Sequence, residues 1–203
     1  MARVLVNLFH PNLGASRGNA AMIDALKGLD SVHINDAYAH YGDSIKIDVA
    51  REKELLENHD ILVFQHPLYW YSGPVLMKAW MEQAIERGWA YPPGIGTALQ
   101  GKIWMHGVTA SGPKNSYSWQ GYNHNSISDY LLPYKGTANL CGAIWKKPYA
   151  IHSVLPSGQE KSWSGAPNIT GSELEAAAMA YLDWVRLAVW SFEESGNNQA
   201  SAI

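Results

Sequence analysis

Residues 10–19 bring hydroxyl, guanidinium and amide side chains together at the start of a helix-like segment. Ser16 is a good N-cap residue, and the free N–H groups at a helix start form an anion site that the helix dipole reinforces. Arg17 and Asn19 could add donors to a phosphate. The segment is neither GxGxxG nor a Walker loop, which disfavours a dinucleotide-binding Rossmann domain and a P-loop NTPase. The alternative is an ordinary capped turn.

Three consecutive aromatic residues, Tyr69, Trp70 and Tyr71, come shortly after the mostly apolar run at residues 60–65. They stand in a loop that ends at Pro74, a residue well suited to the first position of a helix. Consecutive side chains cannot all face one core. The loop therefore favours a stacking surface for a flat aromatic ligand, with core packing as the alternative.

Small residues, from Thr109 to Gly112, follow a third apolar run. Such residues let the backbone approach a ligand closely. Polar and aromatic residues come next, at Tyr117, Gln120, Gly121, Tyr122, Asn123 and His124.

These three segments require a scaffold that brings them together, and the chain alternates strand and helix patterns. Strands are predicted at 3–9, 31–35, 60–65, 102–109 and within 143–154. Helices are predicted at 16–29, 49–58, 74–87, 126–140 with a break near Pro133, and 171–192. Alternation of this kind predicts an α/β fold with a mostly parallel sheet covered on both faces. The loops after the first, third and fourth strands would then meet at the carboxyl edge of the sheet, where such folds bind ligands.

Composition limits the class of protein. The 203 residues fit one domain, which we place at residues 1–192, with residues 193–203 as a disordered tail. A net charge of −3 provides no basic field for nucleic acid. The single cysteine permits a reducing compartment. We find neither a signal peptide nor an apolar run near the ~20 residues of a membrane span, so we expect a cytoplasmic protein. The histidines lack the close spacing of metal ligands, so no metal site is expected.

Together the motifs resemble those of the flavodoxin-like NAD(P)H:quinone oxidoreductases. Within that family, the chain is most similar to the bacterial branch of potassium-efflux ancillary flavoproteins and modulator-of-drug-activity-type quinone reductases. The resemblance covers residues 3–155. It is carried by HP-x4-SR-x-N at 10–19, QHPLYWYSGP at 65–74, KAW and GWAY within 78–91, GVTASG at 107–112, YSWQG at 117–121 and LCG at 140–142.

The resemblance implies a flavodoxin-like three-layer sandwich with a five-stranded parallel sheet in the order 2-1-3-4-5. It also implies a flavin held by residues from the three loops. These are His10, Ser16, Arg17, Gly18 and Asn19 around the phosphate, and Leu68, Tyr69, Trp70, Tyr71, Thr109, Ala110, Ser111 and Gly112 around the ring. FMN is favoured over FAD because nothing after Val154 offers an obvious adenosine pocket.

The expected catalytic residues are Tyr117, Asn123 and His124. In the family, a Tyr and a His on this loop form a catalytic pair. The Tyr falls on Tyr117, whereas the His falls on Asn123, with His124 one place later. The family usually has Thr-Thr-Gly-Gly in the preceding loop, where Ala110 and Ser111 replace two of these residues.

The function implied is two-electron reduction of quinones or similar electrophilic acceptors by NAD(P)H, through a ping-pong hydride transfer in a homodimer. One alternative is a regulatory flavoprotein subunit that docks on a membrane potassium-efflux protein with little turnover. Another is a flavodoxin-like electron carrier, although such carriers are usually strongly acidic. Nine tryptophans and eleven tyrosines are more large aromatics than one core of this size readily buries, which also favours a subunit interface.

Overall fold

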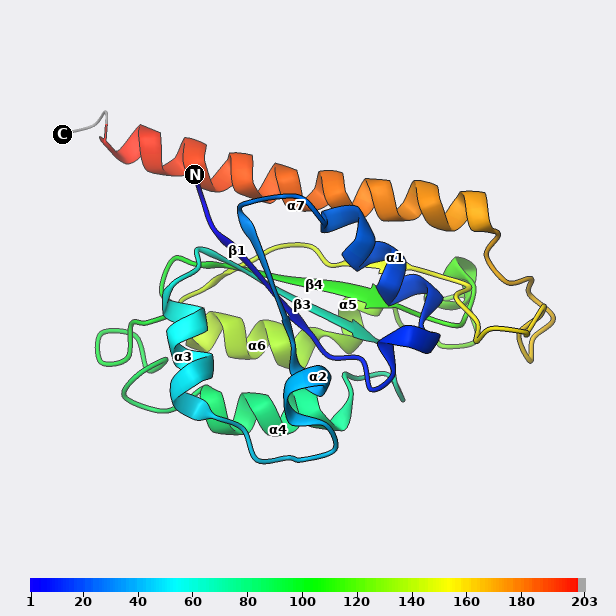
Figure 1. Ribbon diagram of the computed structural model, residues 1–203, viewed down its shortest axis with the longest axis horizontal. Coiled ribbons are helices and arrows are strands. Elements are labelled where there is room, and N and C mark those ends of the chain that lie inside the picture. Colours follow the sequence, from blue (N-terminus) through cyan, green and yellow to red (C-terminus); the bar gives the residue numbers. More distant parts are fainter. Residues whose placement is uncertain (201–203) are drawn as a thin grey trace.

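A parallel sheet runs through the centre of the computed structural model, which describes residues 1–200 and the side chains of residues 1–196 (Figure 1). Its strands are β1 (Val4–Leu8), β2 (Val32–Asp36), β3 (Ile61–Pro67), β4 (Ile103–Thr109), β5 (Ile144–Trp145) and β6 (Tyr149–Ile151). Their order is β2-β1-β3-β4-β5, with β6 also paired to β4. Every residue of β1, β3 and β4 is buried, as expected for a parallel sheet covered on both faces. The predicted fold class and strand order are confirmed.

Helices cover both faces of this sheet. Figure 1 shows α1 (Arg17–Leu26) and α7 (Gly171–Ala200) on one face, and α3 (Val49–Glu57), α4 (Val75–Ala84) and α6 (Leu132–Leu140) on the other. Val4, Val6 and Leu8 of β1 pack with α1 and α7, while Leu5 points to the opposite core. The connections contain the short helices α2 (Ala37–Tyr41) and α5 (Ile127–Tyr130), and the 3-10 turns η1 (Leu13–Ala15) and η2 (Lys114–Ser116).

Several boundaries differ from the sequence-based expectation. The fifth strand is split into β5 and β6, because Pro148 between them has no N–H for the ladder. Pro74 is the N-cap of α4 rather than its first residue. The predicted tail is wrong for residues 193–200, which continue α7, while residues 201–203 lie outside the described part. The expected break near Pro133 is present between α5 and α6.

Two histidines on neighbouring strands form a buried chain of hydrogen bonds. The Nδ1 atom of His66 lies 3.0 Å from the carbonyl oxygen of Pro67. Its Nε2 atom lies 3.1 Å from Nδ1 of His106. The indole N–H of Trp104 donates to His106 Nε2 at 3.0 Å. Since Trp104 can only donate, each histidine must carry its proton on Nδ1, and both rings are neutral. Burial holds the pKa of His66 at about 4 and that of His106 well below its usual value.

Candidate functional site

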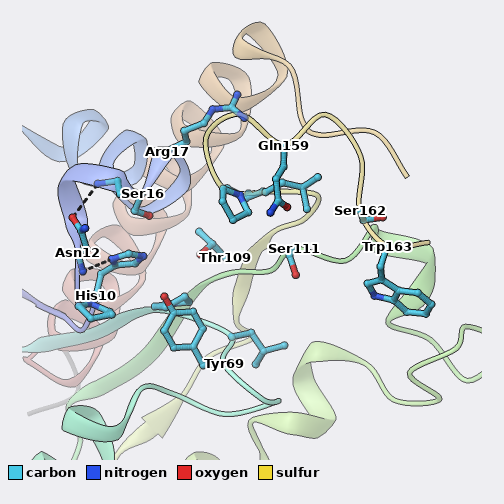
Figure 2. A pocket seen from close by; sticks show the side chains of 17 residues that line it. His10, Asn12, Ser16, Arg17, Tyr69, Thr109, Ser111, Gln159, Ser162 and Trp163 are labelled. Atoms are coloured by element: carbon cyan, nitrogen blue, oxygen red, sulfur yellow. Dashed lines mark hydrogen bonds between the residues drawn. The ribbon is translucent and has the colours of Figure 1, made fainter. Parts of the chain in front are cut away.

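A cavity of about 590 Å³ opens at the carboxyl edge of the sheet. Figure 2 shows its walls converging from the loops after β1, β3 and β4, together with the segment after β6. The lining residues are His10, Pro11, Asn12, Ala15, Ser16, Arg17, Pro67, Leu68, Tyr69, Thr109, Ser111, Val154, Leu155, Pro156, Gln159, Ser162 and Trp163. The three loops singled out in the sequence therefore meet in one place, as their position after parallel strands requires.

The first loop ends in a helix start shaped for an anion. Asn12 caps η1, with its side chain accepting from the Ala15 N–H at 3.2 Å. Ser16 caps α1 by accepting from the Asn19 N–H, also at 3.2 Å. The first N–H groups of a helix have no partner within it, so those of Arg17 and Gly18 remain for other acceptors. A phosphate group would find donors here.

His10 is oriented by the same loop. The backbone N–H of Asn12 donates to its Nδ1 at 3.1 Å, so a neutral imidazole carries its proton on Nε2 and can donate from there. The pKa of His10 is lowered, chiefly by burial, while the contact with Asn12 and the charge of Asp36 act in the opposite direction. His10 therefore presents a neutral N–H donor at this end of the cavity.

The three residues that follow Ser16 have separate positions. Arg17 lies on the cavity wall, but its guanidinium extends toward the segment before α7 and donates to the Ile169 carbonyl at 3.0 Å (Figure 2). A Cβ added at Gly18 would lie 2.9 Å from both Thr109 and Val154, so a larger residue would push helix and loop apart. Close packing of α1 against β4 thus requires glycine at this position.

Asn19 lies behind the cavity wall. It is fully buried, and its amide nitrogen donates to Thr109 Oγ1 at 2.9 Å and to Ser16 Oγ at 3.3 Å. Gln65 donates to the Asn19 carbonyl oxygen at 3.0 Å. The side chain that the sequence assigned to a phosphate is therefore used inside the protein, where it fixes the capping serine relative to β4.

The aromatic loop forms a tight turn closed by two hydrogen bonds between Tyr69 and Ser72, of 2.9 and 3.0 Å. Trp70 and Tyr71 occupy its corners with φ values of 48° and 64°, the left-handed region that non-glycine residues rarely adopt. Leu68 and Tyr69 line the cavity. Trp70 is 94% exposed, and Tyr71 turns to Asn123, donating to its Oδ1 at 3.1 Å.

The loop after β4 has two faces. Thr109 and Ser111 line the cavity, whereas Ala110 is buried and hydrogen-bonded through its backbone to Ile151 and Val154. Gly112 does not line it. A Cβ there would lie 2.9–3.0 Å from side-chain atoms of Tyr122, Ser116 and Tyr117, so only glycine leaves room for this cluster.

The expected catalytic residues lie beside the cavity rather than on its wall. Tyr117 is partly buried against the ring of His152, with centroids 5.3 Å apart. Burial and, as a smaller effect, the neighbouring Tyr122 raise the pKa of Tyr117 to about 12. Asn123 is buried and donates to Ser116 Oγ at 3.3 Å, while His124 is exposed with φ of 55°. Tyr117 and Asn123 are thus held firmly, and His124 projects toward solvent.

Two features of the site were missed from the sequence. His152 follows β6, and its Nδ1 is buried without a hydrogen bond to any described residue. Burial and the charge of Lys114 lower the pKa of this imidazole, while a contact with the Gly112 backbone partly raises it. The second feature is the wall formed by residues 154–163. Its only sequence signal is a tryptophan within a run of Ser, Gly and Pro, which has no periodicity.

The cavity wall carries little charge. Among the described residues, no Asp, Glu or Lys lines it, and residues 1–196 contain no group of His, Cys, Asp and Glu that could hold a metal ion. None of the helices within residues 1–200 has the length and apolar character needed to cross a bilayer. The arrangement suits a ligand with an anionic group at the α1 end and an uncharged, flat remainder.

Comparison with known proteins identifies the family. The model of the flavodoxin-like fold family matches residues 2–166. The glutathione-regulated potassium-efflux system ancillary protein KefG of Shigella flexneri serotype 5b is 36% identical over 184 residues, which are 91% of this chain and 93% of KefG.

Solved structures show the same fold. General stress protein 14 from Treponema denticola, in complex with FMN, is 32% identical with a TM-score of 0.79, covering 92% of this chain and 99% of that one. A thermophilic tryptophan halogenase from Streptomycin violaceusniger is 40% identical with a TM-score of 0.77, covering 87% and 95%. Quinone reductases are matched at 22% identity, a level that shows the shared fold alone.

Proposed function

The chain belongs to the flavodoxin-like fold family, and we propose that it is an FMN-dependent oxidoreductase that carries two electrons from NAD(P)H to quinones or similar electrophilic acceptors. The observation that carries this proposal is the single cavity on which the loops after β1, β3 and β4 converge. It combines a capped helix start, an aromatic side chain and small residues, which are the elements that a phosphorylated, flat cofactor needs.

The residues present fit FMN. Ser16 caps α1 so that the N–H groups of Arg17 and Gly18 are left for a phosphate, and His10 offers a neutral donor beside them. Leu68, Tyr69, Thr109 and Ser111 would border the flavin ring. The complex of the Treponema relative with FMN supports the same choice. We propose FMN rather than FAD on these grounds, with NAD(P)H as the co-substrate.

When bound, FMN would supply the chemistry of hydride transfer between NAD(P)H and the acceptor. The chain's residues would bind, orient and donate. From its place beside the cavity, the hydroxyl of Tyr117 would donate a hydrogen bond to the negative charge that develops on the reduced ring, a kind of preorganised donor whose effect on rate is large. Its raised pKa keeps the hydroxyl protonated at neutral pH. Asn123 would hold Tyr71 and the loop, rather than exchange a proton.

A second candidate function is favoured by the similarity to KefG, whose name describes an ancillary protein of a potassium-efflux system. In this alternative the chain binds flavin and docks on a membrane potassium-efflux protein with little turnover of its own. The third possibility, a flavodoxin-like electron carrier, fits the mild net charge of −3 less well. We also propose a homodimer and a cytoplasmic location, for which the exposed aromatic residues and the lone cysteine are the respective grounds.

The test is a spectrum followed by reduction. The purified protein should be yellow or bind FMN with one-to-one stoichiometry, and anaerobic NADH or NADPH should bleach the flavin before added 2-methyl-1,4-naphthoquinone restores its colour. A protein that binds no FMN would remove the flavin proposal altogether. Binding without any reduction by NADH or NADPH would instead favour the regulatory function.

A further inference from the structure

Trp163 is a large apolar residue that the fold leaves in solvent at the edge of the cavity. It is 83% exposed, yet it is one of the cavity-lining residues. The other strongly exposed tryptophans among residues 1–196, Trp70, Trp119 and Trp190, do not line it. Single exposed apolar residues are common, but Trp163 stands with other aromatics at a pocket, which is where an exposed aromatic signals binding.

The loop around Trp163 is well organised. Lys161 and Pro167 form an antiparallel bridge, and the Ser162 N–H donates to the Ala166 carbonyl at 2.8 Å. The Gly165 N–H donates back to the Ser162 carbonyl at 2.9 Å, which closes a β-turn with Trp163 at its first corner. Backbone hydrogen bonds therefore fix the turn that presents Trp163.

The base of the same loop is tied to the site. Asn168 accepts from the Leu155 N–H at 3.1 Å and donates to the Gln159 carbonyl at 2.8 Å. Arg17 donates to the neighbouring Ile169 carbonyl at 3.0 Å, which links this loop to the start of α1. The wall that carries Trp163 is thus fastened to the helix that carries the anion site.

Trp163 lies at the opposite end of the cavity from His10 and Ser16, as Figure 2 shows. The ring of Tyr122 meets it edge to face, with centroids 5.0 Å apart. Gln159 also lines the cavity, in its middle part, and its side-chain amide can donate to a carbonyl oxygen (Figure 2). Aromatic faces and a neutral donor, without nearby carboxylates or ammonium groups on the wall, suit a flat uncharged ring that carries carbonyl groups.

We propose that Trp163, supported by Tyr122, is the binding surface for the planar ring of the electron acceptor. This inference rests on the proposed function and adds a specificity residue to it. Trp163 selects flat aromatic acceptors, such as naphthoquinones, because a flat ring can stack on the indole. Acceptors that exchange electrons without stacking, such as ferricyanide, gain nothing from it.

The experiment uses FMN-loaded, oxidised protein without NAD(P)H, so that binding is measured without turnover. Calorimetry measures the binding of 2-methyl-1,4-naphthoquinone to four proteins: wild type, Trp163→Ala, Trp163→Phe and the control Trp190→Ala. The control removes an exposed tryptophan of α7 that lies away from the cavity. Trp163→Ala should weaken naphthoquinone binding by about tenfold, equivalent to ~1.4 kcal/mol, while Trp163→Phe retains most of the affinity. The Trp190→Ala control and the FMN affinity of every variant should stay at the wild-type level. In a separate turnover assay with NAD(P)H, the rate of ferricyanide reduction should be the same in Trp163→Ala and wild type.

Two results would overturn the inference while leaving the proposed function in place. One is equal naphthoquinone affinity in Trp163→Ala and wild type. The other is a comparable loss of FMN affinity in Trp163→Ala, which would assign the indole to the cofactor. A third result, a wild-type protein that binds FMN but not the naphthoquinone, would overturn the inference as well. A wild-type protein that binds no FMN would first contradict the proposed function, so the two failures can be told apart.

Discussion

The imidazole of His152 packs against the phenol ring of Tyr117, with ring centroids 5.3 Å apart. The two residues come from different loops, and both surround the backbone of Gly112. The resemblance to quinone reductases places a Tyr and a His on one loop, with the His at Asn123. In this chain the histidine beside Tyr117 comes from the end of β6. Its Nδ1 is buried and forms no hydrogen bond with the residues that the structure describes, and such a group is one that a functional role would explain.

We expect Tyr117→Phe to slow flavin reduction by NAD(P)H about tenfold or more, because loss of one donor to the developing charge costs ~1.4 kcal/mol or more. FMN affinity should hardly change, since the ring is retained. Anaerobic stopped-flow absorbance measures the rate. His40→Asn is the control, because His40 is exposed on α2 and does not line the cavity, so this variant should leave the rate unchanged. An unaltered rate in Tyr117→Phe would exclude its hydroxyl from the mechanism.

Ser16→Ala should weaken FMN binding by about 1–3 kcal/mol, the scale for loss of a charge-assisted hydrogen bond. Ser16 also caps α1, so the variant should lose about 1 kcal/mol of folding free energy. Asp48→Ala separates the two effects, because Asp48 caps α3 in the same way but does not line the cavity. Its stability should fall similarly with FMN affinity intact, as measured by urea unfolding and by flavin titration. Equal FMN affinity in both variants would contradict a phosphate site at Ser16.

A homodimer should use the exposed aromatic surface beside the cavity. Trp70 is 94% exposed in a strained turn, and the Tyr71–Asn123 hydrogen bond joins that turn to the loop that carries Trp119. Trp70→Ser should raise the dimer dissociation constant about 30-fold, the effect of losing a ~2 kcal/mol anchor. Light scattering over a concentration series measures this. Leu187→Ser, on α7, is the control, and a wild type that is monomeric at micromolar concentration would refute the dimer.

The sequence predicted the sheet because β1, β3 and β4 are mostly apolar segments, a pattern that depends on local composition alone. It also identified the loops that form the cavity, since strand order places them at one edge. It did not predict His152 beside Tyr117, because that contact depends on β6 pairing with β4 across a Pro-interrupted strand. The wall at 154–163 was missed for a different reason: an irregular loop has no sequence periodicity and is shaped by its own hydrogen bonds, such as those of Asn168. The sequence could not show that Asn19 is buried and bonded to Thr109, because a polar residue near a helix start can contact the core as well as a ligand.

Acid should destabilise the protein through the buried pair His66 and His106. Burial lowers the pKa of His66 from 6.5 to about 4 and that of His106 well below its usual value. The unfolded chain therefore binds more protons than the folded one below pH 6.5. The contribution of the neutral histidines to the free energy of unfolding is fully present above that pH and is lost as the pH drops from 6.5 toward 4.

For His66 alone, the full loss is about 3 kcal/mol, at ~1.4 kcal/mol for each pKa unit. Urea unfolding between pH 7 and 5, above the range where carboxylates titrate, measures the slope. His66→Gln cannot take up a proton, so its stability should be lower at pH 7 but less dependent on pH. His40→Asn, at an exposed position, should keep the wild-type slope. Identical slopes in His66→Gln and wild type would mean that this imidazole is not held neutral by the core.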